Sequence, residues 1–158
     1  MRYHVFDSER LLSDPSYSSQ EHMEKVFAEA ALPNEDGLEG INEHFPVEFV
    51  SCSREEKSVT YRYFIEPWML NPSGHMHGGV TATICDITMG VLFRYLKGTS
   101  AGVTVHMSVD FTRGIPGDGF VTVTAKAEKT GRNIHFLTAW LYRSSDGELA
   151  AFASGEFV

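Results

Sequence analysis

Asp86 is the residue of this chain whose presence most needs a chemical explanation. It is the only formally charged side chain between Gly78 and Phe93, in a segment that is otherwise almost entirely apolar or small. A carboxylate removed from water without partners costs several kcal/mol, and burial raises its pKa. We therefore expect Asp86 to be paired, hydrogen-bonded, placed at an interface, or catalytic. A satisfied interface carboxylate is the alternative to a catalytic one.

The segment before Val80 has the composition of a site that binds a carbonyl oxygen. Gly78 and Gly79 follow His77 where a helical pattern begins, and without a Cβ they let a ligand approach closely. The first N–H groups of a helix have no partner within it and lie at its positive end. Such donors suit an oxyanion, and the side-chain N–H of Asn71 is a candidate further donor. Ordinary turn chemistry is the alternative explanation.

Metal binding and cysteine catalysis are weaker alternatives for the same region. His75 and His77 form a possible ligand pair, but zinc needs three or four converging ligands, and Asp86 lies more than two helical turns beyond His77. Cys85 has no evident cationic neighbour to activate its thiol, so we interpret it as a core residue. The chain has no phosphate loop or dinucleotide fingerprint. We expect no metal and no cofactor.

Length, charge and composition exclude several classes of function. The chain has 158 residues and a formal net charge of −8, which disfavours nucleic acid as a partner. Two cysteines make no disulfide framework, and the first ten residues lack the apolar core of a signal peptide. No apolar run approaches the roughly 20 residues of a membrane helix. We expect a soluble, cytoplasmic protein that does not bind membranes.

The acidic excess is confined to one half of the chain. Residues 1–90 hold 6 Lys and Arg against 15 Asp and Glu, whereas residues 91–158 hold 7 against 6. A small anionic ligand would therefore prefer the second half. Solvated surfaces of unequal charge are the alternative interpretation.

The hydrophobic pattern predicts how these residues are positioned. Residues 1–17 lack periodicity and are expected to be a loose lead-in, followed by a helix that begins with the capping box Ser18–Glu21 and ends before Pro33. Residues 34–43 are expected to form a connector. Apolar positions nearly all round residues 80–96 predict a buried helix. Alternation and turn signals predict strands at 46–52, 58–66, 101–113, 120–129, 133–143 and 148–157.

The predicted order β-β-α-β-β-β-β indicates an α+β fold, with an antiparallel sheet around one central helix. Short turns between successive strands favour antiparallel neighbours, and in residues 101–113 the odd-numbered apolar side chains are expected on one face. We divide the chain into an extension with one helix, residues 1–45, and a main domain, residues 46–158.

The combined motif resembles one known family. Asn71-x-x-Gly74-x-x-His77-Gly78-Gly79-Val80 followed by Asp86 is similar to the PaaI-like, phenylacetate-pathway branch of the hotdog-fold acyl-CoA thioesterases. The resemblance runs from about residue 46 to the C-terminus and includes 102–105 and 110–113. The extension and the bulky pair His75-Met76 depart from the family pattern, so they are expected to reshape the acyl pocket or the assembly.

The resemblance implies hydrolysis of an acyl-CoA thioester, the CoA being part of the substrate. Asn71 and the Gly78 N–H would polarise the thioester carbonyl, and His77 would brace the turn. Asp86 would be the nucleophile or the base that activates water, and Thr104 would orient that water or the carboxylate. Further substrate contacts are expected at Gly79, and at three basic residues that could meet CoA phosphates or be plain surface: Arg113, Lys129 and Arg132.

The predicted site is shared between subunits. The eight residues from Gly78 to Asp86 span roughly 12 Å of straight helix, too far for both to hold one carbonyl. The resemblance likewise implies that the carboxylate faces the turn of a second subunit, in a homodimer or a tetramer. A hotdog module that binds acyl-CoA without cleaving it, and a hotdog enoyl-CoA hydratase, remain the alternative functions.

Overall fold

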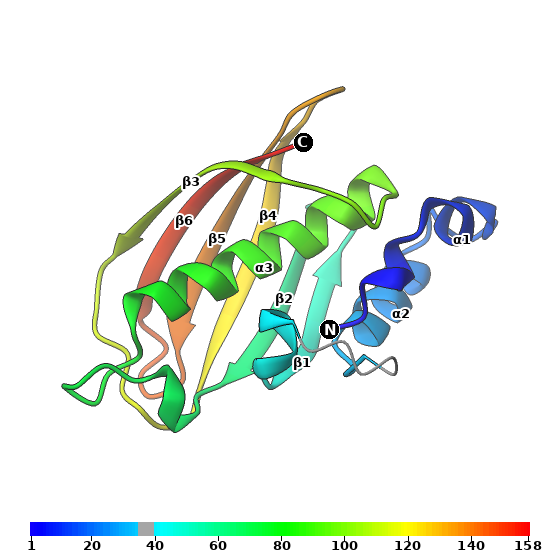
Figure 1. Ribbon diagram of the computed structural model, residues 1–158. Helices are drawn as coiled ribbons and strands as arrows, with labels where there is room; N and C mark the ends of the chain where they lie inside the picture. Colours follow the sequence, from blue (N-terminus) through cyan, green and yellow to red (C-terminus); the bar gives the residue numbers. More distant parts are fainter. Residues whose placement is uncertain (35–39) are drawn as a thin grey trace.

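One antiparallel sheet forms the body of the computed structural model, which describes residues 1–34 and 40–158 (Figure 1). Its strand order is β1-β2-β4-β5-β6-β3. The expected α+β hotdog architecture and element order are confirmed, and strand ends differ from the predicted ones by only a few residues. The strands are β1 (Val47–Ser53), β2 (Ser58–Phe64), β3 (Thr104–Phe111), β4 (Phe120–Thr130), β5 (His135–Arg143) and β6 (Leu149–Phe157).

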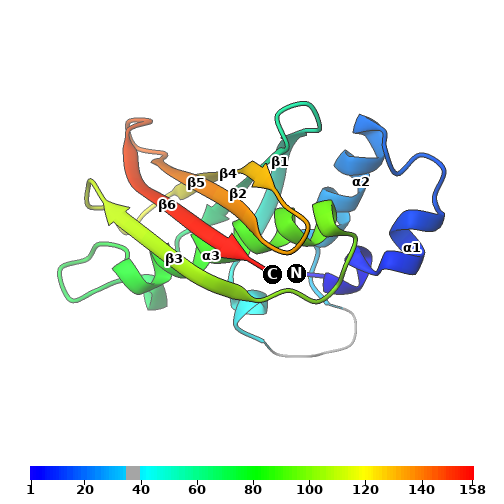
Figure 2. The ribbon, with the colours of Figure 1, turned by 90° about the horizontal axis from the view of Figure 1, so that it is seen from above.

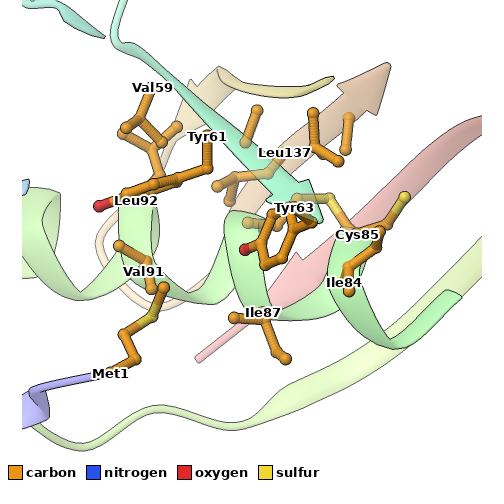
Figure 3. Packing of buried hydrophobic residues seen from close by; sticks show 14 of the residues in the cluster. Met1, Val59, Tyr61, Tyr63, Ile84, Cys85, Ile87, Val91, Leu92 and Leu137 are labelled. Carbon is orange, nitrogen blue, oxygen red and sulfur yellow. The ribbon is translucent and has the colours of Figure 1, made fainter. Parts of the chain in front are cut away.

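Helix α3 (Gly78–Lys97) lies across the concave face of the curved sheet (Figure 2). His77 caps its start, and Gly98 ends it in the left-handed conformation with φ +65°. By length and composition α3 would suffice to cross a membrane, but most of its apolar surface is buried inside this fold. Its side chains form the core with those of the sheet, as Ile84 and Cys85 do beside Tyr63 (Figure 3).

Strand β3 does not pair with β4, the next strand in the chain, although the short connection between them predicted that it would. The loop of residues 114–119 does not make a hairpin, because β3 pairs with β6 and β4 pairs with β2 and β5. The chain instead crosses the end of the sheet from one edge to an interior position. Strand β3 is therefore an edge strand, one side of which has no partner among the described residues.

The odd-numbered apolar residues of β3, expected on one face, are unequally buried. Val105 and Phe111 are each 57% exposed, whereas Met107 and Val109 are half-buried against the core. A register shift between Thr104 and His106 interrupts the alternation, as a β-bulge does. Thr104 is consequently half-buried and reaches a residue of α3.

The first 17 residues are not a loose lead-in. They form a 3₁₀ turn η1 (Tyr3–Phe6) and helix α1 (Ser8–Ser13), so with α2 (Gln20–Ala30) residues 1–45 contain two α-helices rather than the one expected. Ser19, not Ser18, caps α2 by accepting the His22 N–H at 3.1 Å. The expected connector contains the turn η2 (Ile41–His44), and its residues 35–39 lie outside the described part.

Burial explains why this extension is ordered. Phe6 and Phe27 are fully buried, and the Phe27 ring lies 5.0 Å from that of Tyr95 on α3. The Tyr61 hydroxyl on β2 donates to the Phe27 carbonyl at 2.9 Å. Met1 joins the same buried cluster as Val91 (Figure 3). The core is thus continuous across residue 46, and the domain boundary placed there stays a prediction.

Candidate active site

Asp86 lies on the third turn of α3 and is held by the neighbouring strand. The Thr104 hydroxyl donates to Asp86 Oδ1 at 2.7 Å, a normal length for a hydroxyl bound to a carboxylate. Asp86 is half-buried, so this hydrogen bond offsets part of its desolvation. The β3 register shift places Thr104 where it can make the bond. The second carboxylate oxygen has no hydrogen-bond partner within the described ranges.

A cavity of about 200 Å³ opens beside this pair. Its lining includes Asp86 and Thr104, and also Tyr3, Asn42 and Arg94. The N-terminal segment, which the motif does not cover, thus forms one wall of the candidate site. Neither Arg94 nor Tyr3 is among the site residues predicted from the sequence. Arg94 could have been predicted, because it lies eight residues after Asp86 and so on the same face of the helix. No pattern in the residues around Tyr3 indicates that it lies near Asp86.

The start of α3 is built around the His77 side chain. Its Nδ1 accepts the Gly79 N–H at 3.0 Å, and its backbone N–H donates to the Met69 carbonyl at 2.8 Å. The predicted bracing role of His77 therefore has a geometric basis. Gly79, expected to contact substrate, has its N–H occupied by His77, and a Cβ there would lie 3.3 Å from the His77 ring. The Gly78 N–H has no hydrogen-bond partner among the residues described.

Within the loop, the side-chain amide of Asn71 makes hydrogen bonds through its oxygen only. Its Oδ1 accepts the N–H of Ser73 at 2.9 Å and that of His75 at 3.2 Å. Its Nδ2 has no partner in the described part of the chain. The oxygen therefore performs ordinary turn chemistry, and the nitrogen remains available as a donor. The two explanations considered for Asn71 are compatible.

Asn71 and Gly78 line a cavity different from that of Asp86. This second cavity, about 450 Å³ in volume, also includes Phe111, whose ring atoms would lie 3.4 Å from a Cβ on Gly78. Asp86 is not among its lining residues. Within one chain, the uncharged donors and the carboxylate therefore belong to separate sites along α3, as their spacing on a straight helix predicts.

The three basic residues do not converge within one chain. Arg113 lines the cavity of Asn71, is 55% exposed on its side chain, and lies 3.8 Å from Glu148 Oε2. Arg132 lies beside the far end of α3, where its carbonyl accepts Lys97 Nζ at 2.9 Å. Lys129 is exposed on β4, near the same turn. The ends of a 20-residue helix are about 30 Å apart, so one ligand bound to a single chain cannot contact all three.

Cysteine and metal chemistry find no support at this site. Cys85 is fully buried, and burial with the nearby Asp86 carboxylate raises the pKa of its thiol to about 12. No group of three His, Cys, Asp or Glu side chains able to hold a metal occurs among residues 1–34 and 40–158. His75 instead directs Nδ1 toward the Ser73 carbonyl at 3.1 Å.

Comparisons with known proteins agree with this fold. Residues 73–150 match the family model of the thioesterase superfamily. Acyl-coenzyme A thioesterase THEM4 of Xenopus laevis is 32% identical over 107 residues, which cover 67% of this chain and 47% of that protein. The chain spans about half the length of the curated relatives it matches.

Solved structures extend the similarity beyond the matched residues. Zebrafish thioesterase superfamily member 2 aligns with a TM-score of 0.67 and 25% identity, over 87% of this chain and 95% of that one. A phenylacetic acid degradation-related protein of Ralstonia eutropha JMP134 aligns with a TM-score of 0.69 and 20% identity, over 84% and 96%. The fold is that of the hotdog thioesterases. Residues 73–150 of this chain form a domain of the thioesterase superfamily.

Proposed function

We propose that this protein hydrolyses acyl-CoA thioesters, at sites that two copies of the chain form together. One observation carries the proposal: the Asp86–Thr104 pair lines one cavity, and the uncharged donors Asn71 and Gly78 line another. Membership in the thioesterase superfamily and similarity to an acyl-CoA thioesterase support the reaction class. An isologous dimer with antiparallel α3 helices would join the two half-sites twice.

In this site the thioester carbonyl oxygen accepts hydrogen bonds from the Gly78 N–H and from Asn71 Nδ2 of one copy. Both donors are fixed before substrate binds, Gly78 by the cap of α3 and Asn71 by its Oδ1 contacts in the loop. Preorganised donors of this kind stabilise the negative charge that develops on the oxygen in the transition state. The positive end of α3 contributes in the same direction.

Asp86 of the other copy faces the carbonyl carbon. The Thr104 hydroxyl holds Oδ1 and leaves Oδ2 for the reaction. Either Oδ2 takes a proton from the attacking water, or it attacks the carbonyl itself and water then hydrolyses the resulting anhydride. In both routes the C–S bond breaks, the acyl group leaves as a carboxylic acid, and the CoA sulfur takes up a proton.

The free edge of β3 supports the second copy. Three large apolar residues are exposed on or beside this edge strand: Val103, Val105 and Phe111. Burying them against a second copy would remove apolar surface from water and pair the open strand edge. Phe111 also lies against Gly78, so an interface along β3 would reach the carbonyl-binding turn. We propose a homodimer as the minimal active unit, and a dimer of dimers is compatible with it.

Hydrolysis is tested with a panel of short, medium and aromatic acyl-CoA esters, using an assay that detects the released CoA thiol. Hydrolysis of at least one ester, lost in Asp86→Asn, is the expected result. A wild-type protein that binds acyl-CoA but cleaves none of the panel would favour the non-catalytic binding module. Hydration of an enoyl-CoA without thiol release would favour the hydratase.

A further inference from the structure

The cavity beside Asp86 contains a cation that the proposed hydrolysis does not use. Asp86, Gly90 and Arg94 recur every four residues and so occupy one face of α3. Side chains on a helix tilt toward its N-terminus, which brings Arg94 back toward Asp86. A Cβ on Gly90 would lie only 3.0 Å from Arg94 Nη1. Because Gly90 has no Cβ, the guanidinium of Arg94 can lie against the helix at this position.

Two contacts fix the orientation of this guanidinium without neutralising it. Its central carbon lies 4.6 Å from the centroid of the Tyr3 ring, a cation–π contact, and Nε donates to the Ser100 carbonyl at 3.2 Å. In the described part of the chain no carboxylate lies within 4.0 Å of Arg94, and Nη1 and Nη2 have no hydrogen-bond acceptor. Arginine stays protonated, so a positive charge with free donors lines the cavity.

The cavity walls indicate what would meet that charge. Besides Asp86 and Arg94, the cavity is lined by apolar side chains, among them Ile87, Phe93 and Phe157. Burial raises the pKa of the Tyr3 phenol to about 12, so its hydroxyl stays protonated and can donate. An occupant needs an apolar middle and an end that accepts hydrogen bonds from a cation.

We propose that this cavity binds the acyl group, and that Arg94 selects acyl groups whose far end is a carboxylate. The proposal rests on the hydrolysis proposed above, because it takes the thioester carbonyl to lie at Asp86. A guanidinium and a carboxylate form paired, parallel hydrogen bonds, which an ammonium does not reproduce. The substrate class is thus the mono-CoA thioesters of short dicarboxylic acids.

The length of the acyl group follows from the helix. The guanidinium lies at the level of Gly90, four residues and about 6 Å beyond Asp86. An extended chain advances about 1.2 Å per bond, so three or four bonds between the two carboxyl carbons leave space for a hydrogen bond to Arg94. Acyl groups of four or five carbons, succinyl and glutaryl, meet this requirement and fit within about 200 Å³.

A neutral acyl chain of the same length would leave the guanidinium desolvated and unpaired. Sites built to pair with a polar substrate group discriminate strongly against analogues that lack it. Because Arg94 is only half-buried, we expect a preference of about a hundredfold rather than the larger ratios of enclosed sites. The competing explanation is that Arg94 only anchors Tyr3 and the N-terminal segment to α3.

The test measures kcat/KM for glutaryl-CoA and pentanoyl-CoA, which share a five-carbon chain, on wild type, Arg94→Met and Arg94→Lys. Wild type should prefer glutaryl-CoA about a hundredfold. Arg94→Met should reduce that ratio to near one by lowering the glutaryl rate alone, and Arg94→Lys should keep part of the preference. Thermal unfolding of each variant reports whether it is folded.

Equal rates for both esters in wild type, or an equal loss for both in Arg94→Met, would overturn the proposal, the latter in favour of the anchoring role. Calorimetric titration of both esters into Asp86→Asn, with and without Arg94→Met, measures the same selectivity without hydrolysis. An Arg94-dependent preference for glutaryl-CoA there, in a protein whose wild type cleaves neither ester, would support the acyl selectivity and refute the hydrolase. No preference in the titration would refute the selectivity.

Discussion

The two cavities along α3 differ in what they offer a ligand. The cavity at the start of the helix presents uncharged donors, the Gly78 N–H and Asn71 Nδ2, whereas the cavity about two turns further presents the Asp86 carboxylate and the Arg94 cation. The first cavity holds the donors proposed for the oxyanion but no carboxylate, and the second holds the Asp86 carboxylate apart from those donors. On the function proposed above, neither cavity alone is a complete hydrolytic site, and a second copy of the chain would bring the two together.

The two cavities also differ in how the chain builds them. Residues 71–79 make the first cavity's donors through hydrogen bonds that are local in sequence, such as the cap of Gly79 by His77. The second needs α3, the edge strand β3 and the N-terminal segment, joined by the Thr104–Asp86 hydrogen bond and the Tyr3–Arg94 contact. Substitutions distant in sequence should therefore disturb the second cavity more than the first.

The largest effect is expected for Asp86→Asn. The amide can neither take a proton from water nor attack the carbonyl, so kcat for the best acyl-CoA substrate should fall about a thousandfold. Asp118→Asn, in the exposed loop before β4, is the matched control and should leave kcat unchanged. A folded Asp86→Asn variant with a near-normal rate would remove Asp86 from the mechanism.

A smaller loss is expected for Thr104→Val, which keeps the shape of the side chain and removes the donor to Asp86 Oδ1. The carboxylate remains but is less well oriented, so kcat should fall about tenfold. The KM should change little, since the acyl pocket is intact. Thr122→Val on β4 controls for a general effect of losing a strand threonine. A Thr104→Val loss expressed only in KM would contradict the orienting role.

A buried histidine that packs against Phe93, a residue lining the Asp86 cavity, should make stability depend on pH. His135 is 4% exposed and its ring packs edge-on against Phe93 with 5.1 Å between the ring centroids; neither ring nitrogen has a hydrogen-bond partner among residues 1–34 and 40–158. Burial first, then the nearby cations Lys97 and Lys57, lower its pKa below the ordinary 6.5. Below pH 6.5 the unfolded chain binds a proton that the folded chain does not, so the free energy of unfolding should decrease as pH falls through this window.

Denaturant unfolding of wild type and His135→Leu between pH 5 and 7.5 checks this dependence. The variant should lose the part of the slope that wild type shows below pH 6.5, whereas the exposed control His4→Leu should keep it. Equal slopes in wild type and His135→Leu would mean that other groups control the acid sensitivity.

No loss at all is expected from metal removal. Neither cavity presents three converging metal ligands among the described residues, and the proposed reaction needs only Asp86 and fixed donors. Activity should survive exhaustive chelation, and elemental analysis should find less than one zinc per chain. Loss of activity on chelation with recovery on zinc addition would contradict a metal-free site.

Features that depend on residues close together in the chain could be predicted from the sequence, and features that depend on distant contacts could not. The strands, helix α3, the glycine-containing turn that begins it and the isolated Asp86 follow from local patterns, and the structure contains these elements where expected. The pairing of β3 with β6 and the burial of Phe6 depend on contacts between residues far apart in the chain. Tyr3 reaches the Asp86 cavity through such contacts, so no local pattern could have placed it there.

A mixed-subunit experiment tests the central claim that Asn71 and Asp86 act across two copies. Asn71→Ala loses one oxyanion donor and should be about a hundredfold less active, and Asp86→Asn is inactive for its own reason. Equal amounts of the two chains are unfolded, mixed and refolded. Random pairing makes half of the dimers mixed, and one of two sites in each mixed dimer regains both residues, so about a quarter of wild-type activity should return. Mixed dimers shown to have formed, with no recovery of activity, would contradict the shared site.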